Sequence, residues 1–462
     1  MLAPFLTQLD EEATTEGPID PLGLAAIADE LAGRLIPNQR LQPISVRFLT
    51  AMAVGAEVCR DLYTNEDTVA ADGVTPPWLV FEWHVLEGLV RSEGRVDALM
   101  DVEQLRGIPG IGKTRQAIAE QIPLSKDKYL VSPGIMGFHG VLKSLAKELE
   151  IVDLDNFPGM PGAGGERLLE AWVADGAEAL AGFTEPGDGE GRRIRTRWRD
   201  AVKDAMQRGQ VQRRAGWAGW MEIGQYLAPG HVMGEEECTV LLELLRNSPN
   251  GGFRRHVFDF ICSPQWRKCA MFEGQTGEFE RNVHQTMRAA AGRELALLLD
   301  AIMIYERWAR LLHDAFEACL NRMTERRGKV QPSQFVSLDE VRSAGNEVRS
   351  LYMNVADHLA AVEPSVASRF ADLFAYLATD GDTADWHHRL LEHHRQVQQR
   401  KPPEGKNPWF DTFDDGGVAL RPAYRRPDPV EPGRGYVHGY RTKALAWFAR
   451  DLGVMDDGTQ TP

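Results

Sequence analysis

The chain lacks the features that would place it in several large classes of protein. No uncharged apolar run approaches the length of a membrane span, and no basic region precedes the short N-terminal apolar stretch. Its five cysteines contain no C-x-x-C pair, which is typical of reduced thiols rather than of a disulfide framework. We therefore expect a cytoplasmic protein with neither a secretory signal nor a membrane partner.

Motifs for catalysis and for cofactor binding are also missing. The sequence contains no nucleophile elbow of a Ser-His-Asp hydrolase, no G-x-G-x-x-G turn and no paired acidic motif of a metal-dependent nuclease. His256, Cys262 and Cys269 lack the spacing and the fourth ligand of a zinc site, and the histidines within 387–394 do not form H-E-x-x-H. We expect no cofactor, no metal and no catalytic residue, which favours a protein that is not an enzyme.

What is present is an acidic chain of ordinary globular composition. The 462 residues are 43% hydrophobic and 26% charged, and this length predicts two to four domains. The formal net charge of -15 argues against nucleic-acid binding over the whole surface, but it is compatible with a local basic site. The charge is uneven, because residues 1–75 hold twelve acidic residues and four arginines, and the first lysine is Lys113.

Hydrophobic residues recur with a helical period along nearly the whole chain, which predicts a mainly α, multi-helical fold with few strands. The main expected helices cover residues 21–36, 43–63, 77–93, 278–326 and 338–362. A capping box at Ser337 and Glu340 opens the last of these. The expected regions are an N-terminal helical region 1–95, a helix-turn-helix-like module 96–160, a central helical domain 161–330, a C-terminal helical region 331–400 and a Pro/Gly-rich segment with a terminal helix 401–462.

Residues 107–114, GIPGIGKT, fit two different motifs. As G-x-x-x-x-G-K-T they match the P-loop of nucleotide hydrolases, which would use Lys113 and Thr114. A P-loop follows a buried strand, whereas residues 96–106 have apolar residues at helical spacing, so this interpretation is less favoured. As I-P-G-I-G between two helical segments they resemble a helix-hairpin-helix element, which implies DNA phosphate contacts by Gly110, Gly112 and Lys113. A plain helix-loop-helix corner remains the alternative.

Residues 130–153 resemble the later half of a winged helix-turn-helix. Ser132 and Pro133 are typical of a helix start, and glycines at 134, 137 and 140 are unfavourable inside the helix that follows. The apolar face of this helix consists of Val141, Leu142, Leu145 and Leu149. Ile151-Val152 predicts one wing strand, no second strand is evident, and Glu150 stands where such domains usually have glycine. The resemblance implies a helix in the major groove. The residues expected to face nucleic acid are Met136, His139, Lys143 and Lys147.

A basic helix is predicted at residues 192–208. One stripe of it consists of Arg192, Arg195, Arg199 and Lys203, while Ile194 and Trp198 belong to the opposite apolar stripe. The stripe of cations suits contacts with phosphates. The alternative is a solvated helix whose arginines pair with the acidic N-terminal region or with a partner.

The Pro/Gly-rich segment after residue 400 is basic and aromatic. We expect it to wrap over the helical body, anchored by Trp409, Tyr424, Tyr436 and Tyr440; the alternative is that these rings stack on single-stranded nucleic acid.

These patterns together predict a DNA-binding or DNA-complex accessory protein without catalytic activity. Its expected partners are DNA and the proteins of a multi-subunit complex. The chain resembles uncharacterised helical components of bacterial defence or mobile-element systems in its size and its Arg-rich, Lys-poor composition. The alternatives are a protein-protein scaffold without nucleic-acid contact and a P-loop nucleotide hydrolase.

Overall fold

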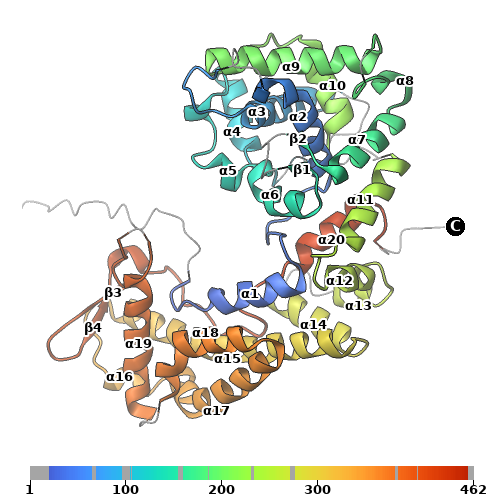
Figure 1. The fold of residues 1–462 in the computed structure, drawn as a ribbon. Helices are drawn as coiled ribbons and strands as arrows, with labels where there is room; N and C mark the ends of the chain where they lie inside the picture. Colours follow the sequence, from blue (N-terminus) through green and yellow to red (C-terminus); the bar gives the residue numbers. More distant parts are fainter. Residues whose placement is uncertain are drawn as a thin grey trace, which may run out of the picture. The chain divides into compact units, whose positions relative to one another are not determined.

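The computed structural model describes residues 20–64, 69–95, 105, 107–153, 160–185, 187–229, 234–270, 276–379, 383–402 and 404–455. These residues are mainly helical, with two small two-stranded antiparallel sheets (Figure 1), so the predicted fold class is confirmed. None of the helices in the described part of the chain combines the length and the hydropathy that a membrane span requires. The chain forms two compact units, unit 1 with Met1–Ala32 and Arg267–Tyr440, and unit 2 with Gly33–Trp266 and Arg441–Pro462.

Unit 2 contains the segment predicted to contact DNA. Its helices are α2 (Arg47–Thr64), α3 (Pro77–Ser92), α4 (Ile111–Ala119), α5 (Pro133–Met136), α6 (Phe138–Glu148), α7 (Ala163–Asp175), α8 (Ala177–Leu180), α9 (Glu190–Arg208), α10 (Ala218–Leu227), α11 (Glu235–Asn247), α12 (Arg254–Ile261) and α20 (Thr442–Asp451), with the 3-10 turn η3 (Lys126–Lys128). Helix α1 (Ala25–Leu35) begins in unit 1 and ends in unit 2, and α13 (Trp266–Ala270) crosses the other boundary.

Helix α3 is the central helix of unit 2. It begins with Pro77, whose fixed φ and missing N–H suit the first helical position. The helix packs against α2, α4, α9 and α10, which explains why it is buried on more than one face. His84 on this helix is buried and its Nδ1 lies 2.8 Å from the Val80 carbonyl oxygen. Burial lowers the pKa of His84 to about 4, so the ring is a neutral core group at pH 7.

Unit 1 is built around the 34-residue helix α15. Its elements are α14 (Thr276–Arg288), α15 (Arg293–Arg326), α16 (Ser333–Val336), α17 (Asp339–Val362), α18 (Pro364–Phe374), η4 (Ala375–Ala378), α19 (Thr383–Gln399), β3 (Phe410–Thr412), β4 (Val418–Leu420) and η5 (Pro422–Tyr424). Helix α15 packs against α14, α17 and α19. Strands β3 and β4 pair antiparallel, with Asp411 opposite Ala419.

Two details of the helix prediction in unit 1 are wrong. The helix expected over 278–326 is divided into α14 and α15 by a corner at Gly292, which Arg288 stabilises with two hydrogen bonds of 2.8 Å to Asp300. The capping box at Ser337 does not form. Leu338 is the residue that precedes α17, and the Ser337 hydroxyl donates to the Gln334 carbonyl oxygen at 3.0 Å.

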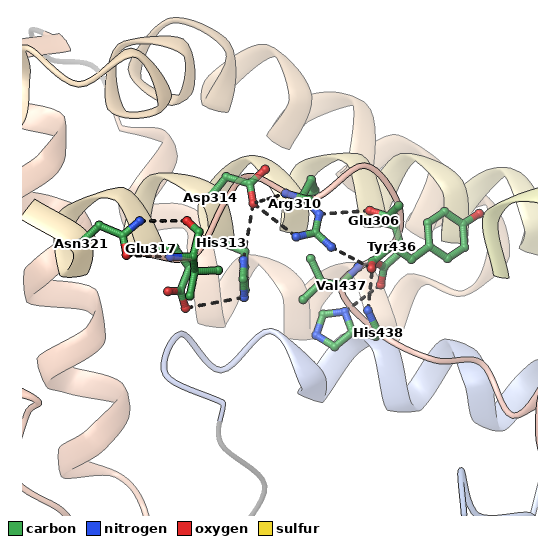
Figure 2. A network of polar contacts seen from close by, with 12 residues as sticks. Glu306, Arg310, His313, Asp314, Glu317, Asn321, Tyr436, Val437 and His438 are labelled. Carbon is green, nitrogen blue, oxygen red and sulfur yellow. Dashed lines mark hydrogen bonds and ion pairs between the residues drawn. The ribbon is translucent and has the colours of Figure 1, made fainter. Parts of the chain in front are cut away.

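The segment 426–440, which we call the C-terminal strap, lies along α15. Figure 2 shows that the polar side chains of one α15 face point toward it. The buried carboxylate of Glu306 accepts hydrogen bonds from the Val437 N–H at 2.6 Å, from His438 Nδ1 at 2.7 Å and from the Tyr440 hydroxyl at 2.8 Å. Arg310 donates to the carbonyl oxygens of residues 435 and 436. These contacts satisfy the backbone of an extended segment that has no strand partner of its own.

The wrapping predicted for the C-terminal segment is present within unit 1. Trp409, Tyr436 and Tyr440 are buried, and Tyr424 stacks on Trp409 with ring centroids 5.0 Å apart. The histidine-rich helix α19 takes part in the same packing, because His394 Nδ1 contacts the Pro21 carbonyl oxygen and its Nε2 accepts the Trp409 N–H. These rings are therefore core groups of unit 1.

Candidate nucleic-acid interface

The predicted helix-turn-helix-like region corresponds to α4, η3, α5, α6 and the first small sheet. The helix expected over 96–106 lies outside the described residues, apart from Leu105. In place of the single helix that Ser132 and Pro133 were expected to start, the structure has two, α5 and α6, divided at Gly137. The break occurs where the sequence has its three unfavourable glycines.

Packing explains two of these glycines, Gly137 and Gly140. A Cβ atom on Gly140 would lie 2.5 Å from the carbonyl carbon of Gly134, so α5 crosses α6 backbone to backbone. A Cβ atom on Gly137 would clash with the Glu82 carboxylate. Glycine lowers the helix propensity of this segment, but a larger residue would not fit at these two contacts.

A buried carboxyl group on α3 holds the module in place. Glu82 is fully buried and accepts a hydrogen bond of 2.6 Å from the Tyr129 hydroxyl and one of 3.0 Å from the His139 backbone N–H. Burial raises the pKa of Glu82 to about 7, and the two hydrogen bonds oppose that rise. The other end of α6 is tied by an ion pair between Glu148 and the fully buried Arg254. Both ends of α6 are therefore fixed to the body of unit 2.

A second strand pairs with the predicted strand at Ile151-Val152, although the sequence showed none. Strand β1 (Val152–Asp153) pairs antiparallel with β2 (Met160–Pro161), with Val152 opposite Pro161. Glu150 adopts a left-handed φ of 54°, a conformation that glycine takes more readily than any other residue. The signal for β2 is hidden because each strand has only two residues, fewer than any period can show.

The helix α6 has one buried and one charged face. Phe138, Val141, Leu142 and Leu145 are buried, whereas Lys143 and Lys147 are exposed. Lys113 on α4 and Lys126 and Lys128 on η3 are exposed as well. Lys126 lies 3.4 Å from Asp72. Five of the eleven lysines of the chain thus lie between residues 113 and 147. Lys126 and Lys128 were not among the predicted contacts, although the pattern K-D-K within a polar loop indicates exposed cations.

His139, which was expected to face nucleic acid, packs instead against α3. Its ring stacks on Trp78 with centroids 4.2 Å apart. Burial lowers the pKa of His139 to about 4, with a smaller effect of the nearby Lys143 charge. The ring is neutral at pH 7 and cannot act as a cation for phosphate.

The residues of the GIPGIGKT motif differ in their surroundings. Gly110 has a left-handed φ of 85°, and a Cβ atom there would lie 2.5 Å from the Tyr129 hydroxyl. Gly112 and Lys113 are exposed, and nothing lies within 4 Å of a Cβ atom on Gly112. Thr114 is buried, and its hydroxyl donates to the Gly110 carbonyl oxygen at 3.0 Å. A P-loop would need this hydroxyl to face Mg²⁺, so the arrangement does not favour nucleotide binding.

The basic helix α9 is half-buried and rich in ion pairs. Arg195 pairs with Glu57 on α2, and Arg199 lies 3.8 Å from Asp61 on the same helix and 2.8 Å from Asp200. Arg192 is half-buried on the same side, where its charge acts on Glu57. Lys203 is half-buried one turn further along. The arginines thus face acidic residues within residues 1–75, as the alternative interpretation expected, and they are less exposed than the lysines of α4, η3 and α6.

Among the described residues, no three His, Cys, Asp or Glu side chains come together as a possible metal site. Comparison with protein-family models, with curated proteins and with solved structures finds no match to this chain.

Proposed function

We propose that the protein binds nucleic acid through the exposed lysines of α4, η3 and α6, as a non-catalytic accessory component of a DNA-processing complex. The observation that supports this is the concentration of lysines on one helix-turn-helix-like module of an acidic chain. Residues 111–150 hold six basic and four acidic residues, whereas the whole chain has a net charge of -15. One of these four acids, Glu148, is neutralised by Arg254.

The arrangement of α6 suits a helix that contacts duplex DNA. Its apolar face is buried and both of its ends are fixed, so the exposed face with Lys143 and Lys147 is held rigidly outward. Lysines neutralise phosphates without reading sequence, and each contact releases a condensed counterion. The remaining acidic surface would repel DNA, so contact would be restricted to this face.

Salt dependence provides the test. We expect the full chain to bind a fluorescent duplex with a logarithmic salt slope of about -4 to -5 if all five lysines contact phosphates, so that affinity falls about 500-fold between about 50 and 200 mM salt. The double substitution Lys113→Ala and Lys143→Ala should reduce the magnitude of the slope by about 2. Fluorescence anisotropy over a salt series measures both.

The matched control removes the same charge elsewhere. Lys268 and Lys329 lie in unit 1, and substituting both by alanine should leave the slope unchanged. Absence of binding at low salt would refute the proposal and favour the scaffold alternative, in which a partner protein co-purifies in a fixed ratio. Equal slopes for the two double variants would show that the lysines of α4–α6 are not the contact.

A further inference from the structure

Three large apolar side chains of this module are exposed, and we call them the apolar tip: Val131, Ile135 and Met136. Val131 is 100% exposed and the other two are 56% exposed. They lie within six residues, in and just before α5. Exposed apolar side chains gathered in this way mark interaction sites more often than single ones do.

The apolar tip is held rigidly in its exposed position. The Glu82 carboxylate accepts hydrogen bonds from Tyr129, which precedes the apolar tip in the chain, and from the His139 N–H, which follows it. A single buried carboxyl group therefore holds both ends of the loop that carries the tip. Within the loop, the backbone N–H groups of Ile135 and Met136 donate to the Ser132 carbonyl oxygen at 3.0 and 2.9 Å. The close approach of Gly140 to the backbone of Gly134 and Ile135 packs α5 directly against α6. A loop fixed in this way loses little conformational entropy on binding.

Lysines precede and follow the apolar tip in the sequence. Lys128 precedes Val131 by three residues, which places the two within about 10 Å along the chain. Lys143 follows Gly140, the point where α5 crosses α6, by three residues or one helical turn. Exposed apolar side chains in a lysine-rich segment suit a ligand that carries both apolar bases and anionic phosphates.

We infer that the apolar tip is a wedge that inserts between neighbouring bases and makes the protein prefer nucleic acid with an unstacked step. This inference rests on the proposed function and names its substrate class. Proteins that kink DNA insert Ile, Met or Leu side chains in this way, and the energetic cost of unstacking is smaller where a base is already unpaired. Bulged or mismatched duplexes are therefore the preferred ligands.

The test compares two duplexes of equal length, one fully paired and one with a single-nucleotide bulge. We expect the wild-type chain to bind the bulged duplex about tenfold more tightly, which corresponds to about 1.4 kcal/mol. The double substitution Ile135→Ser and Met136→Ser should bring this ratio close to one and leave the salt slope on the paired duplex unchanged. Because both side chains are exposed, the substitutions open no cavity in the core.

The control substitutes two other exposed apolar residues of unit 2, Val69→Ser and Val74→Ser, which are 63% and 67% exposed. It should keep the tenfold preference. Equal affinity of the wild type for both duplexes, or a preference that persists in the tip variant, overturns the inference while the proposed function stands. Absence of binding to both duplexes overturns both. Binding to phosphatidylserine vesicles that the tip variant loses, without any bulge preference, would assign the tip to a membrane surface instead.

Discussion

Replacing Glu82 by glutamine should remove a pH dependence from the stability of unit 2. The pKa of Glu82 is raised from 4.5 to about 7 by burial, so the folded chain holds this proton more tightly than the unfolded chain. Between these two values the folded state binds more protons, and its free energy of unfolding decreases as the pH rises. The stabilisation is complete below pH 4.5, is lost through pH 7, and amounts to about 3 kcal/mol for a pKa difference of about 2.5.

The glutamine variant imitates the protonated carboxyl group at every pH. Its amide can accept the His139 N–H with the oxygen and donate to the Tyr129 hydroxyl with the nitrogen, which preserves both contacts of Glu82. We expect its stability relative to the wild type to increase by about 2 to 3 kcal/mol between pH 5 and pH 8. Other titrating groups are shared by both proteins and cancel in the difference.

Hydrogen exchange of the full chain, measured by mass spectrometry on peptides that cover α6, reports the local opening free energy. Peptides from α17 in unit 1 provide the control, because their protection should be the same in both proteins. A difference between wild type and variant that does not change with pH would refute the reasoning. It would mean that Glu82 titrates near its ordinary pKa despite its burial.

Two further substitutions test the structure. Glu150→Gly should stabilise the chain by about 1 kcal/mol in a thermal melt, because Glu150 has a left-handed φ of 54°; a lower melting temperature would contradict this. Glu306→Ala should destabilise the C-terminal strap by about 3 to 5 kcal/mol, because it leaves buried donors without an acceptor. Limited proteolysis should then cut within 426–440, whereas substitution of the exposed Glu431 by alanine should change nothing.

The sequence predicted the helices well where their apolar period was long. The anchoring of the C-terminal segment by aromatic rings followed from residue type. Predictions from local sequence patterns were wrong where one helix ends and the next begins. The corner between α14 and α15 is stabilised by Arg288, which binds Asp300 twelve residues further along the chain. At the expected cap, the Ser337 hydroxyl donates to the Gln334 carbonyl oxygen instead of capping α17.

For the candidate interface, the sequence determined the charge and the tertiary structure decided which charges are available. The clustering of lysines between 113 and 147 is a property of the sequence. Only the fold brings Glu57 and Asp61 against the arginines of α9, and only the fold turns His139 onto Trp78. Ion pairing and burial join residues far apart in the chain, and no local pattern records such contacts.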